Sequence, residues 1–222
     1  MIDQEVFVGR PRRPLLSRDR IVAAALDLVD AEGLEAVSIR RLATELGVQG
    51  PSLYNHVATK DDLLDAMVDA VLGKIDLSMF TDISDWRVAL RDWARSYRAA
   101  LAAHPKVVPA LNQGMGRRPN ALRQADAVFG GLVAAGWPRR EATQVGALMR
   151  FFVIGSTLGS FAGGFPEDAA VYRGNYPHLD EAHLLSGRQR DIDDAAFETG
   201  LHALLDGLSL RFETLEGAAG GR

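Results

Sequence analysis

Apolar residues recur at the 3.6-residue spacing of amphipathic helices along most of the chain. In the first third, this spacing predicts four helices, over residues 18–32, 39–46, 51–57 and about 60–75. A serine or threonine precedes three of them, a glycine ends two, and a proline opens the third, as helix ends favour. These residues are Ser17, Gly33, Ser38, Gly47, Pro51 and Thr59.

The remaining sequence predicts four longer helices, at about residues 86–103, 119–135, 138–163 and 191–215. No segment shows the alternation of apolar and polar residues that marks a strand, so the predicted fold class is all-α. Residues 164–190 form a long connection with little periodicity, within which a short helix at about 179–186 fits. We expect a flexible basic arm over residues 1–16 and a disordered tail over residues 217–222.

Two of the short helices, within residues 38–57, have the arrangement of a helix-turn-helix motif. The second of them has an apolar flank, Leu53 and Val57, that would hold it against its neighbours. Its other face is short and polar, as a helix that enters the major groove of DNA requires. The candidate contacts are Gln49, Ser52, Tyr54, Asn55 and His56, with Arg40 and Arg41 at the start of the preceding helix.

The block from residue 17 to residue 71 resembles the N-terminal DNA-binding domain of TetR-family transcriptional regulators. The resemblance rests on the run SIRRLATELGV, followed by SLYNHV and by a lysine before an acidic and apolar helix start. The matching positions are Ile21, Ala24, Leu28, Gly33, Ser38, Arg40, Leu42, Ala43, Leu46, Gly47, Val48, Leu53, Tyr54, His56, Val57, Lys60, Leu63 and Leu64.

This resemblance implies a repressor-type regulator that works as a homodimer. A three-helix domain over residues 17–62 would bind a palindromic operator in double-stranded DNA, and a helical domain over residues 63–216 would bind a small effector and form the dimer. The later helices look most like those of the tetracycline-repressor branch.

The resemblance also assigns roles within the motif. Arg40 matches a position that contacts a base or a phosphate, and Lys60 matches an anchor to the DNA backbone. Gly50 stands where many members carry a bulkier polar residue, so one base contact is expected to be missing. Gln49, Ser52 and Asn55 match exposed positions of the recognition helix, Tyr54 and His56 match phosphate contacts, and Ser38, Gly50 and Pro51 complete the expected interface. The residues alone leave His56 open as a packed structural histidine, and they favour Arg41 as a solvated helix charge.

The helices between residues 86 and 160 are expected to enclose the effector pocket. Large apolar residues at helical spacing also fill plain cores, so composition does not separate the two interpretations. His104 is the one histidine of this region, which does not suit a magnesium–tetracycline complex and favours an aromatic or hydrophobic effector. The candidate lining residues are Trp93, Tyr97, Leu111, Met115, Phe129, Met149 and Phe152.

The helices at about residues 139–163 and 191–215 are the expected dimer surface. Gly155, Gly159 and Gly163 recur every four residues and would form a flat strip for close contact, within the chain or between chains. The last helix carries an apolar stripe longer than one small core needs. The expected interface residues are Gly155, Gly159, Leu201, Leu204, Leu205, Leu208 and Phe212.

Composition changes this picture in two respects. The chain has no cysteine, which excludes disulfides, cysteine nucleophiles and thiolate metal sites. Its net charge of −4 argues against a nucleic-acid binder, but residues 1–60 carry eight basic and eight acidic residues, so the acidity lies in the later part. Few Lys and Arg residues are available to contact the DNA phosphates. We therefore expect DNA affinity to depend on dimerisation and to fall steeply as the salt concentration rises.

Other functions are less well supported. No paired carboxylates, Ser/His/Asp set or phosphate-binding loop is evident, so we expect neither an enzyme nor a cofactor. His178 and His183 flank two acidic residues, but at no recognised metal spacing, so no metal is expected. The longest uncharged stretch, residues 151–166, is shorter than the roughly 20 residues of a membrane span, and no export signal is evident, which suits a cytoplasmic protein. The alternative function is an effector-independent helical DNA-binding or protein-interaction module.

Overall fold

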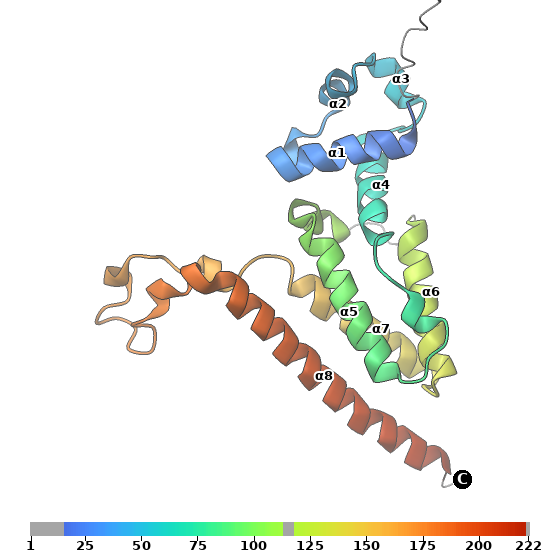
Figure 1. Ribbon diagram of the computed structural model, residues 1–222, viewed down its shortest axis with the longest axis vertical. Helices are drawn as coiled ribbons and strands as arrows, with labels where there is room; N and C mark the ends of the chain where they lie inside the picture. The colour runs from blue at the N-terminus through green and yellow to red at the C-terminus, as the bar shows by residue number, and fades with distance from the viewer. Residues whose placement is uncertain (1–15, 113–117, 221–222) are drawn as a thin grey trace, which may run out of the picture.

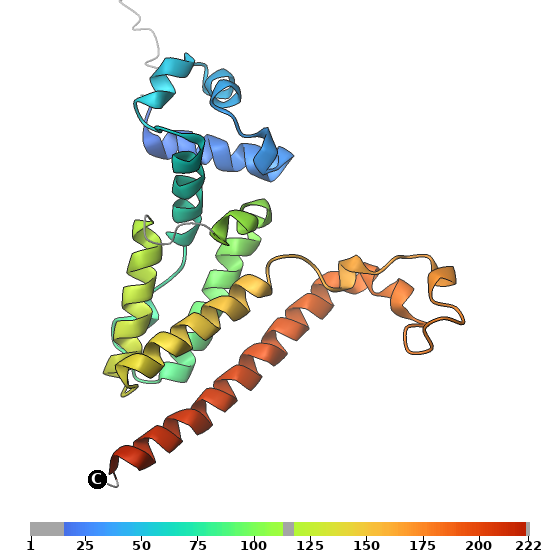
Figure 2. The same cartoon turned by 180° about the vertical axis from the view of Figure 1, so that it is seen from behind.

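The computed structural model describes residues 16–112 and 118–220. Every regular element in these two ranges is helical, which confirms the all-α prediction. Three short helices form a head at one end, a fourth connects the head to a body of longer helices, and a long segment projects sideways from the body (Figures 1 and 2). The helices are α1 (Arg18–Glu32), α2 (Ile39–Leu46), α3 (Gly50–Tyr54), α4 (Lys60–Leu72), α5 (Trp86–Ala102), α6 (Pro119–Ala134), α7 (Arg139–Gly155) and α8 (Gln189–Gly220).

The head helices begin and end where the sequence places their caps. The side-chain oxygens of Ser17, Ser38 and Thr59 each accept a hydrogen bond from the backbone N–H three residues later, at 3.0–3.2 Å. Gly47 ends α2 in the left-handed conformation, with a φ of 66°, that glycine adopts most readily. The turn from α2 into α3 therefore follows directly from local sequence.

The body is organised around α5, which packs against α4, α7 and α8. Short 3-10 helices complete it, η2 (Ser78–Phe80) before α5 and η3 (Pro105–Asn112) after it. Arg95 of α5 makes two hydrogen bonds with Glu198 of α8, at 2.9 and 2.6 Å, and Arg98 lies over the ring of Phe197. These contacts fasten α8 along α5 within one chain.

The end of α7 differs from the prediction. The helix ends at Gly155 rather than near residue 163, because the hydroxyls of Ser156 and Thr157 donate to the carbonyls of Val153 and Ile154, at 2.7 and 2.9 Å. Gly159 therefore lies beyond the helix, and the predicted helical strip of three glycines does not form.

The segment that follows contains only short 3-10 turns. They are η5 (Ala162–Gly164), η6 (Ala169–Val171), η7 (Ala182–Leu184) and η8 (Ser186–Arg188), and the last two fall where a short helix was expected. The final helix is longer than predicted and continues through residues 217–220, where the sequence suggested a disordered tail. The arm over residues 1–15 and residues 221–222 lie outside the described residues.

The boundary expected between residues 62 and 63 falls inside a continuous helix. Helix α4 contacts α1 in the head and α5, α6 and η3 in the body, so it belongs to both parts. The division into two domains there stays a prediction. In the ranges 16–112 and 118–220, no helix has the length and the apolar character needed to cross a bilayer.

Candidate nucleic-acid interface and ligand pocket

Helix α3 packs against the head through its apolar side and exposes its other side to solvent. Leu53, within α3, and Val57, just after it, are completely buried, as their four-residue spacing predicted. Tyr54 is 57% exposed, although its large ring would gain by burial, and Asn55 beside it is exposed as well. The head therefore presents a rigid, polar helix face to the outside.

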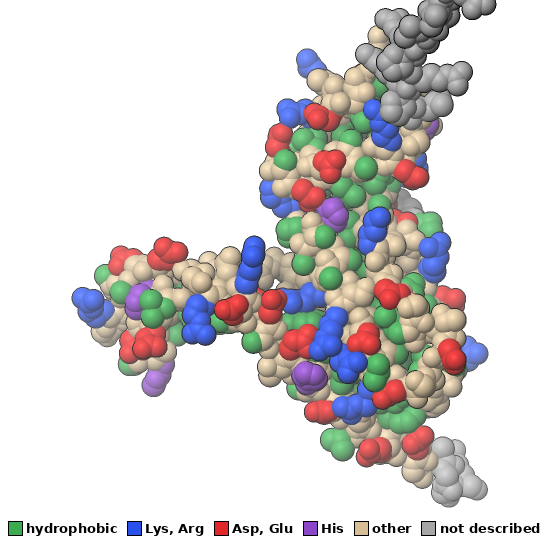
Figure 3. Space-filling view, viewed as in Figure 1, with side chains coloured by type: hydrophobic (Ala, Val, Ile, Leu, Met, Phe, Trp, Pro, Cys, Tyr) green, Lys and Arg blue, Asp and Glu red, His purple; other side chains and the backbone are tan. Residues whose placement is uncertain are grey.

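The other predicted DNA contacts surround this face. Gln49, Pro51, Arg40 and Lys60 are exposed, whereas Gly50, Ser52 and His56 are half-buried. The Ser38 side chain is exposed but its oxygen caps α2. Arg41 pairs with Glu32 of α1 at 2.7 Å, which agrees with its interpretation as a helix charge. Lys and Arg are interspersed with Asp and Glu over the visible face of the head, without a large basic patch (Figure 3).

Arg18 fixes the position of α3, a role that the sequence did not indicate. Its guanidinium makes two hydrogen bonds to Asp62, at 2.6 and 3.2 Å, and donates a third to the backbone carbonyl of His56, at 2.6 Å. Asp62 also accepts from the backbone N–H of Ala58. The hydrogen bonds from Arg18 hold the pKa of the Asp62 carboxyl below its usual range, against the effect of burial. The end of α3 is thus tied to α1 and α4 together.

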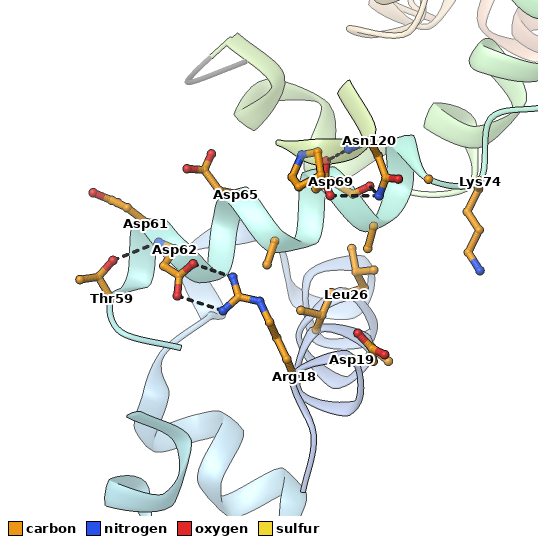
Figure 4. A pocket seen from close by; sticks show the side chains of 16 residues that line it. Arg18, Asp19, Leu26, Thr59, Asp61, Asp62, Asp65, Asp69, Lys74 and Asn120 are labelled. Carbon is orange, nitrogen blue, oxygen red and sulfur yellow. Dashed lines mark hydrogen bonds and ion pairs between the residues drawn. The ribbon is translucent and has the colours of Figure 1, made fainter. Parts of the chain in front are cut away.

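An acidic groove of about 990 Å³ lies beside this contact, between α1, α4 and the start of α6 (Figure 4). Four aspartates of α4 line it, but three of them already have partners. Asp62 binds Arg18, Asp65 binds Arg118, and Asp69 accepts from the backbone N–H and the side-chain amide of Asn120. The groove carries the polar contacts that join the head to the body, and α4 supplies the acceptors.

Arg118 is the centre of the connection between α4 and the body. Its side chain is almost fully buried, contacts Asp65 at 2.8 Å and donates to the backbone carbonyls of Ala110 and Leu111. A second contact joins η3 to the end of α1, where His104 Nδ1 lies 2.7 Å from an Asp30 carboxylate oxygen. Lys106 donates to the backbone carbonyls of Asp30 and Ala31. Sequence reasoning missed the contacts of Arg118 with Asp65 and of His104 and Lys106 with the end of α1, because these partners are 53 to 76 residues apart along the chain.

A cavity of about 180 Å³ lies between α5, α6 and α7. Trp93 and Phe129, both predicted lining residues, form part of its wall, together with Gln124, Val128 and Arg150. Gly146 leaves the space into which the ring of Phe129 packs. The cavity lies in the region where the sequence predicted an effector pocket.

The other predicted lining residues are not in this wall. Tyr97, Met149 and Leu111 are buried in the surrounding core. Phe152 points to α8 instead, where it stacks on Phe197 with ring centroids 5.2 Å apart, because it lies on the opposite side of α7 from the cavity. Met115 lies outside the described residues.

Several polar atoms near the cavity have no hydrogen-bond partner. They include Nε1 of Trp93 and Nε2 of Gln124, on two wall residues that are 2% and 5% exposed. The Tyr97 hydroxyl behind them also lacks a partner in hydrogen-bonding geometry, although Arg150 is near. Burial raises the pKa of this hydroxyl, and the charge of Arg150 opposes the rise.

The predicted dimer residues of α8 are mostly used inside the chain. Leu201, Leu205 and Leu208 are buried in the body's own core, and Leu204 packs partly against it. Phe212 contacts the rings of Trp86 and Trp137, at centroid distances of 5.6 and 5.0 Å. Leu201, Leu205 and Leu208 therefore offer little surface to a second copy, because α8 packs its apolar stripe inside the chain, and the role of this set at a dimer interface stays a prediction. Gly155 and Gly159 are exposed.

The histidines of the projecting segment do not form a cluster. His183 Nδ1 lies 3.1 Å from the backbone carbonyl oxygen of Asp180. Over residues 16–112 and 118–220, no group of three or more His, Asp or Glu side chains could hold a metal ion.

Comparison with known proteins agrees with this arrangement. The pattern of bacterial regulatory proteins of the tetR family matches residues 21–67, and the pattern of the tetracyclin repressor-like C-terminal domain matches residues 81–212. The chain is 34% identical over 214 residues to the tetracycline repressor protein class A from transposon 1721 of Escherichia coli, covering 93% of this chain and 97% of that protein.

Two solved structures from Streptomyces coelicolor are similar over most of the chain. A possible TetR family transcriptional regulator has a TM-score of 0.72 and 34% identity, covering 87% of this chain and 99% of its own. The protein ActR in complex with actinorhodin has a TM-score of 0.70 and 28% identity, covering 89% and 99%.

Proposed function

This chain belongs to the tetR family of bacterial regulatory proteins, and from that premise we propose that it is a transcriptional repressor. It binds a palindromic operator as a homodimer through α3, and a small effector in the body releases it from DNA. The exposed polar face of α3, fixed from behind by buried Leu53 and Val57, is the observation that supports DNA binding most directly.

The recognition surface would consist of residues around α3. Asn55 and Gln49 are the candidates for contacts to base edges, since amide side chains donate and accept in the pattern that adenine presents. Tyr54, Arg40 and Lys60 are the candidates for phosphate contacts, which position the helix without reading sequence. Because a single five-residue helix offers few contacts, useful affinity requires two heads on one operator.

For the dimer, we propose the faces of α7 and α8 that the chain's own core leaves uncovered. Phe151 and Leu210 are each 67% exposed, and Leu148 lies one turn before Phe151 on α7. Gly155 and Gly207 add open positions where an added Cβ would touch nothing in this chain, so a partner helix can approach closely. Burying two large exposed side chains per copy would supply the apolar centre of a four-helix interface.

The effector site that we propose is the cavity between α5, α6 and α7. Its partly apolar wall supports an aromatic or hydrophobic compound, as the sequence suggested. The similar protein ActR has a structure in complex with actinorhodin, which supports a small-molecule effector for a chain of this fold. Release requires the effector to bind the conformation that does not fit DNA more tightly than the one that does.

We place the protein in the cytoplasm, where it would meet operator DNA, and we propose no catalytic role for it. The similar proteins are regulators or repressors by name, which supports a regulatory role. The alternative function is a helical DNA-binding or protein-interaction module that acts without an effector. In that case no small compound should release the protein from its DNA.

A gel-shift assay tests the proposal. The purified chain should shift a palindromic sequence from the DNA beside its own gene at low salt, and the affinity should fall steeply as salt rises. Tyr54→Ala should weaken binding to all sequences, whereas Asn55→Ala should change the base preference. Arg123→Ala, at an exposed site on α6, serves as the control and should bind normally. Absence of any shift at low salt would contradict the proposed function.

A further inference from the structure

The cavity between α5, α6 and α7 is not lined as a dry core cavity is. Empty cavities in proteins are apolar, since buried polar groups need hydrogen-bond partners. Here Trp93 Nε1 and Gln124 Nε2 are buried donors without partners, and both residues belong to the wall. Leaving two such donors unpaired is costly for the folded chain, so the site is chemically suited to an acceptor that arrives from outside.

Arg150 adds a positive charge to the same wall. It comes from α7 and is half-buried, and within the two described ranges no carboxylate forms an ion pair with it. The neighbouring side chain is the uncharged hydroxyl of Tyr97. A guanidinium is always protonated and presents parallel donors that match the two oxygens of a carboxylate. This side chain therefore favours an anionic group over a neutral acceptor.

The rest of the wall favours a flat apolar body. The indole of Trp93 and the ring of Phe129 face the cavity with Val128, and Phe151 stands at its exposed side. The volume of about 180 Å³ is slightly more than that of a cavity known to hold one benzene ring, at about 150 Å³. A ligand of one or two fused rings fits this space.

We infer that the effector is a small aromatic carboxylate whose rings pack on Trp93 and Phe129 and whose carboxylate binds Arg150. The amide of Gln124 donates to the same carboxylate, which satisfies a buried donor that has no partner in the chain. This inference rests on the proposed function, because it names the chemical class of the effector for the proposed site. It assigns to Arg150 the selection of a negatively charged effector over a neutral one.

The test compares two probes of the same shape, 2-naphthoate and the uncharged 2-naphthamide, by isothermal titration with the full chain. Wild type should bind the acid at least about tenfold more tightly, since a charge-assisted bidentate pair is stronger than a neutral hydrogen bond. Arg150→Met should abolish this preference while the amide still binds. Arg150→Lys, which keeps the charge and loses the bidentate fork, should retain part of it.

Two further variants separate the site from general effects. Gln124→Leu should weaken binding of the acid several-fold and raise the Tm of the free protein, because it removes an unpaired buried amide. Arg140→Met, at an exposed position in the first turn of α7, is the matched control and should keep the full preference for the acid. Equal affinity for the two probes, no binding of either, or a preference that survives Arg150→Met would overturn the inference.

The operator gel shift distinguishes this result from the proposed function. If wild type and Arg150→Met shift the palindrome equally but the acid preference is missing, only the ligand class is wrong. If no palindrome is shifted, the proposed function fails, and the difference between the two probes can still be read from the titrations. Addition of 2-naphthoate to the wild-type complex should release the DNA, and the same addition to the Arg150→Met complex should not.

Discussion

At the scale of single residues, a few charged side chains hold the head against the body. Arg118 is the most buried of them, and its partners come from α4 and η3. Arg18 is more exposed, with 46% of its side chain accessible, and its partners come from α4 and the end of α3. Because the Arg118 contacts are buried and the Arg18 contacts are partly exposed, removal of Arg118 should lower the free energy of unfolding more than removal of Arg18.

Replacement of Arg118 by Met should destabilise the protein strongly. The substitution keeps most of the side-chain volume but leaves Asp65 and two backbone carbonyls without their buried donor, which typically costs about 3 kcal/mol or more. Urea unfolding measures the change. Arg123→Met, on the exposed side of α6, should stay within about 0.5 kcal/mol of wild type, and a similar result for Arg118→Met would contradict the role of the buried contact.

The pairing of Asp62 with Arg18 predicts a pH dependence. The folded-state pKa of Asp62 lies below its unfolded value, so its contribution is present above about pH 4 and is lost as the pH falls through the folded-state pKa. Asp62→Asn should therefore be less stable than wild type at pH 7, by at most about 1 kcal/mol because both side chains are partly exposed.

That difference should shrink in acid, as followed by thermal melts at several pH values. Asp61→Asn, which removes an exposed carboxylate from the same helix turn, is the control and should show a weaker trend. A gap between Asp62→Asn and wild type that stays constant from pH 7 to strong acid would rule out the ion pair as its cause.

At the scale of elements, the helix ends decide how the recognition helix is presented. The turn between α2 and α3 begins with Gly47 in the left-handed region, and α3 then begins at Gly50 with ordinary helical geometry. Apart from the residues next to it in the chain, an added Cβ meets no atom within 4 Å at either glycine. The two positions therefore isolate backbone conformation from packing.

Alanine at these two glycines should have opposite effects on stability. Gly47→Ala should cost about 1–2 kcal/mol, because a side chain disfavours the left-handed conformation. Gly50→Ala should be neutral or stabilising by up to about 1 kcal/mol, because it restricts the unfolded chain at a helical position. Chemical denaturation of both variants tests this, and equal effects would show that the turn conformation is not the controlling feature.

At the scale of the whole molecule, the position of α8 changes which surface is free for a partner. Because α8 lies along α5 and buries most of its leucine stripe there, the large apolar side chains that α7 and α8 leave exposed are Leu148, Phe151 and Leu210. We therefore expect the proposed dimer to use residues outside that stripe.

Glutamate at Phe151 together with Leu210 should separate the dimer without unfolding the chain. Both side chains are exposed in one copy, so the folded monomer loses little, whereas the interface would have to bury the charges. Sedimentation velocity should show monomers, and operator affinity should fall sharply since one head makes few contacts. Leu122→Glu, at an exposed site on α6, should remain dimeric. A double variant that stays dimeric would place the interface elsewhere.

The amino-acid sequence was sufficient to predict the helices of the head, their caps and the exposed face of α3. These features depend on residues close together in the chain: the serine caps, Gly47 and the spacing of Leu53 and Val57. Two of the residues that it proposed for the pocket, Trp93 and Phe129, line a cavity, and the role of that cavity stays a prediction. The sequence could not tell which side of a helix meets which neighbour, so Phe152 was assigned to the pocket although it stacks on α8.

The contacts between residues far apart in the chain became visible in the packed structure alone. The apolar pattern of α7 continues past Gly155, and the hydroxyls that end the helix give no periodic signal. The burial of Leu201 and Leu205 within one chain and the ion pair of Arg118 with Asp65 join elements that are far apart in sequence, and the packing of the helices places Arg150 and Gln124 in the wall of one cavity. Helix caps and apolar periodicity depend on residues close together in the sequence. Which side chains contact each other across helices depends on how the helices pack together.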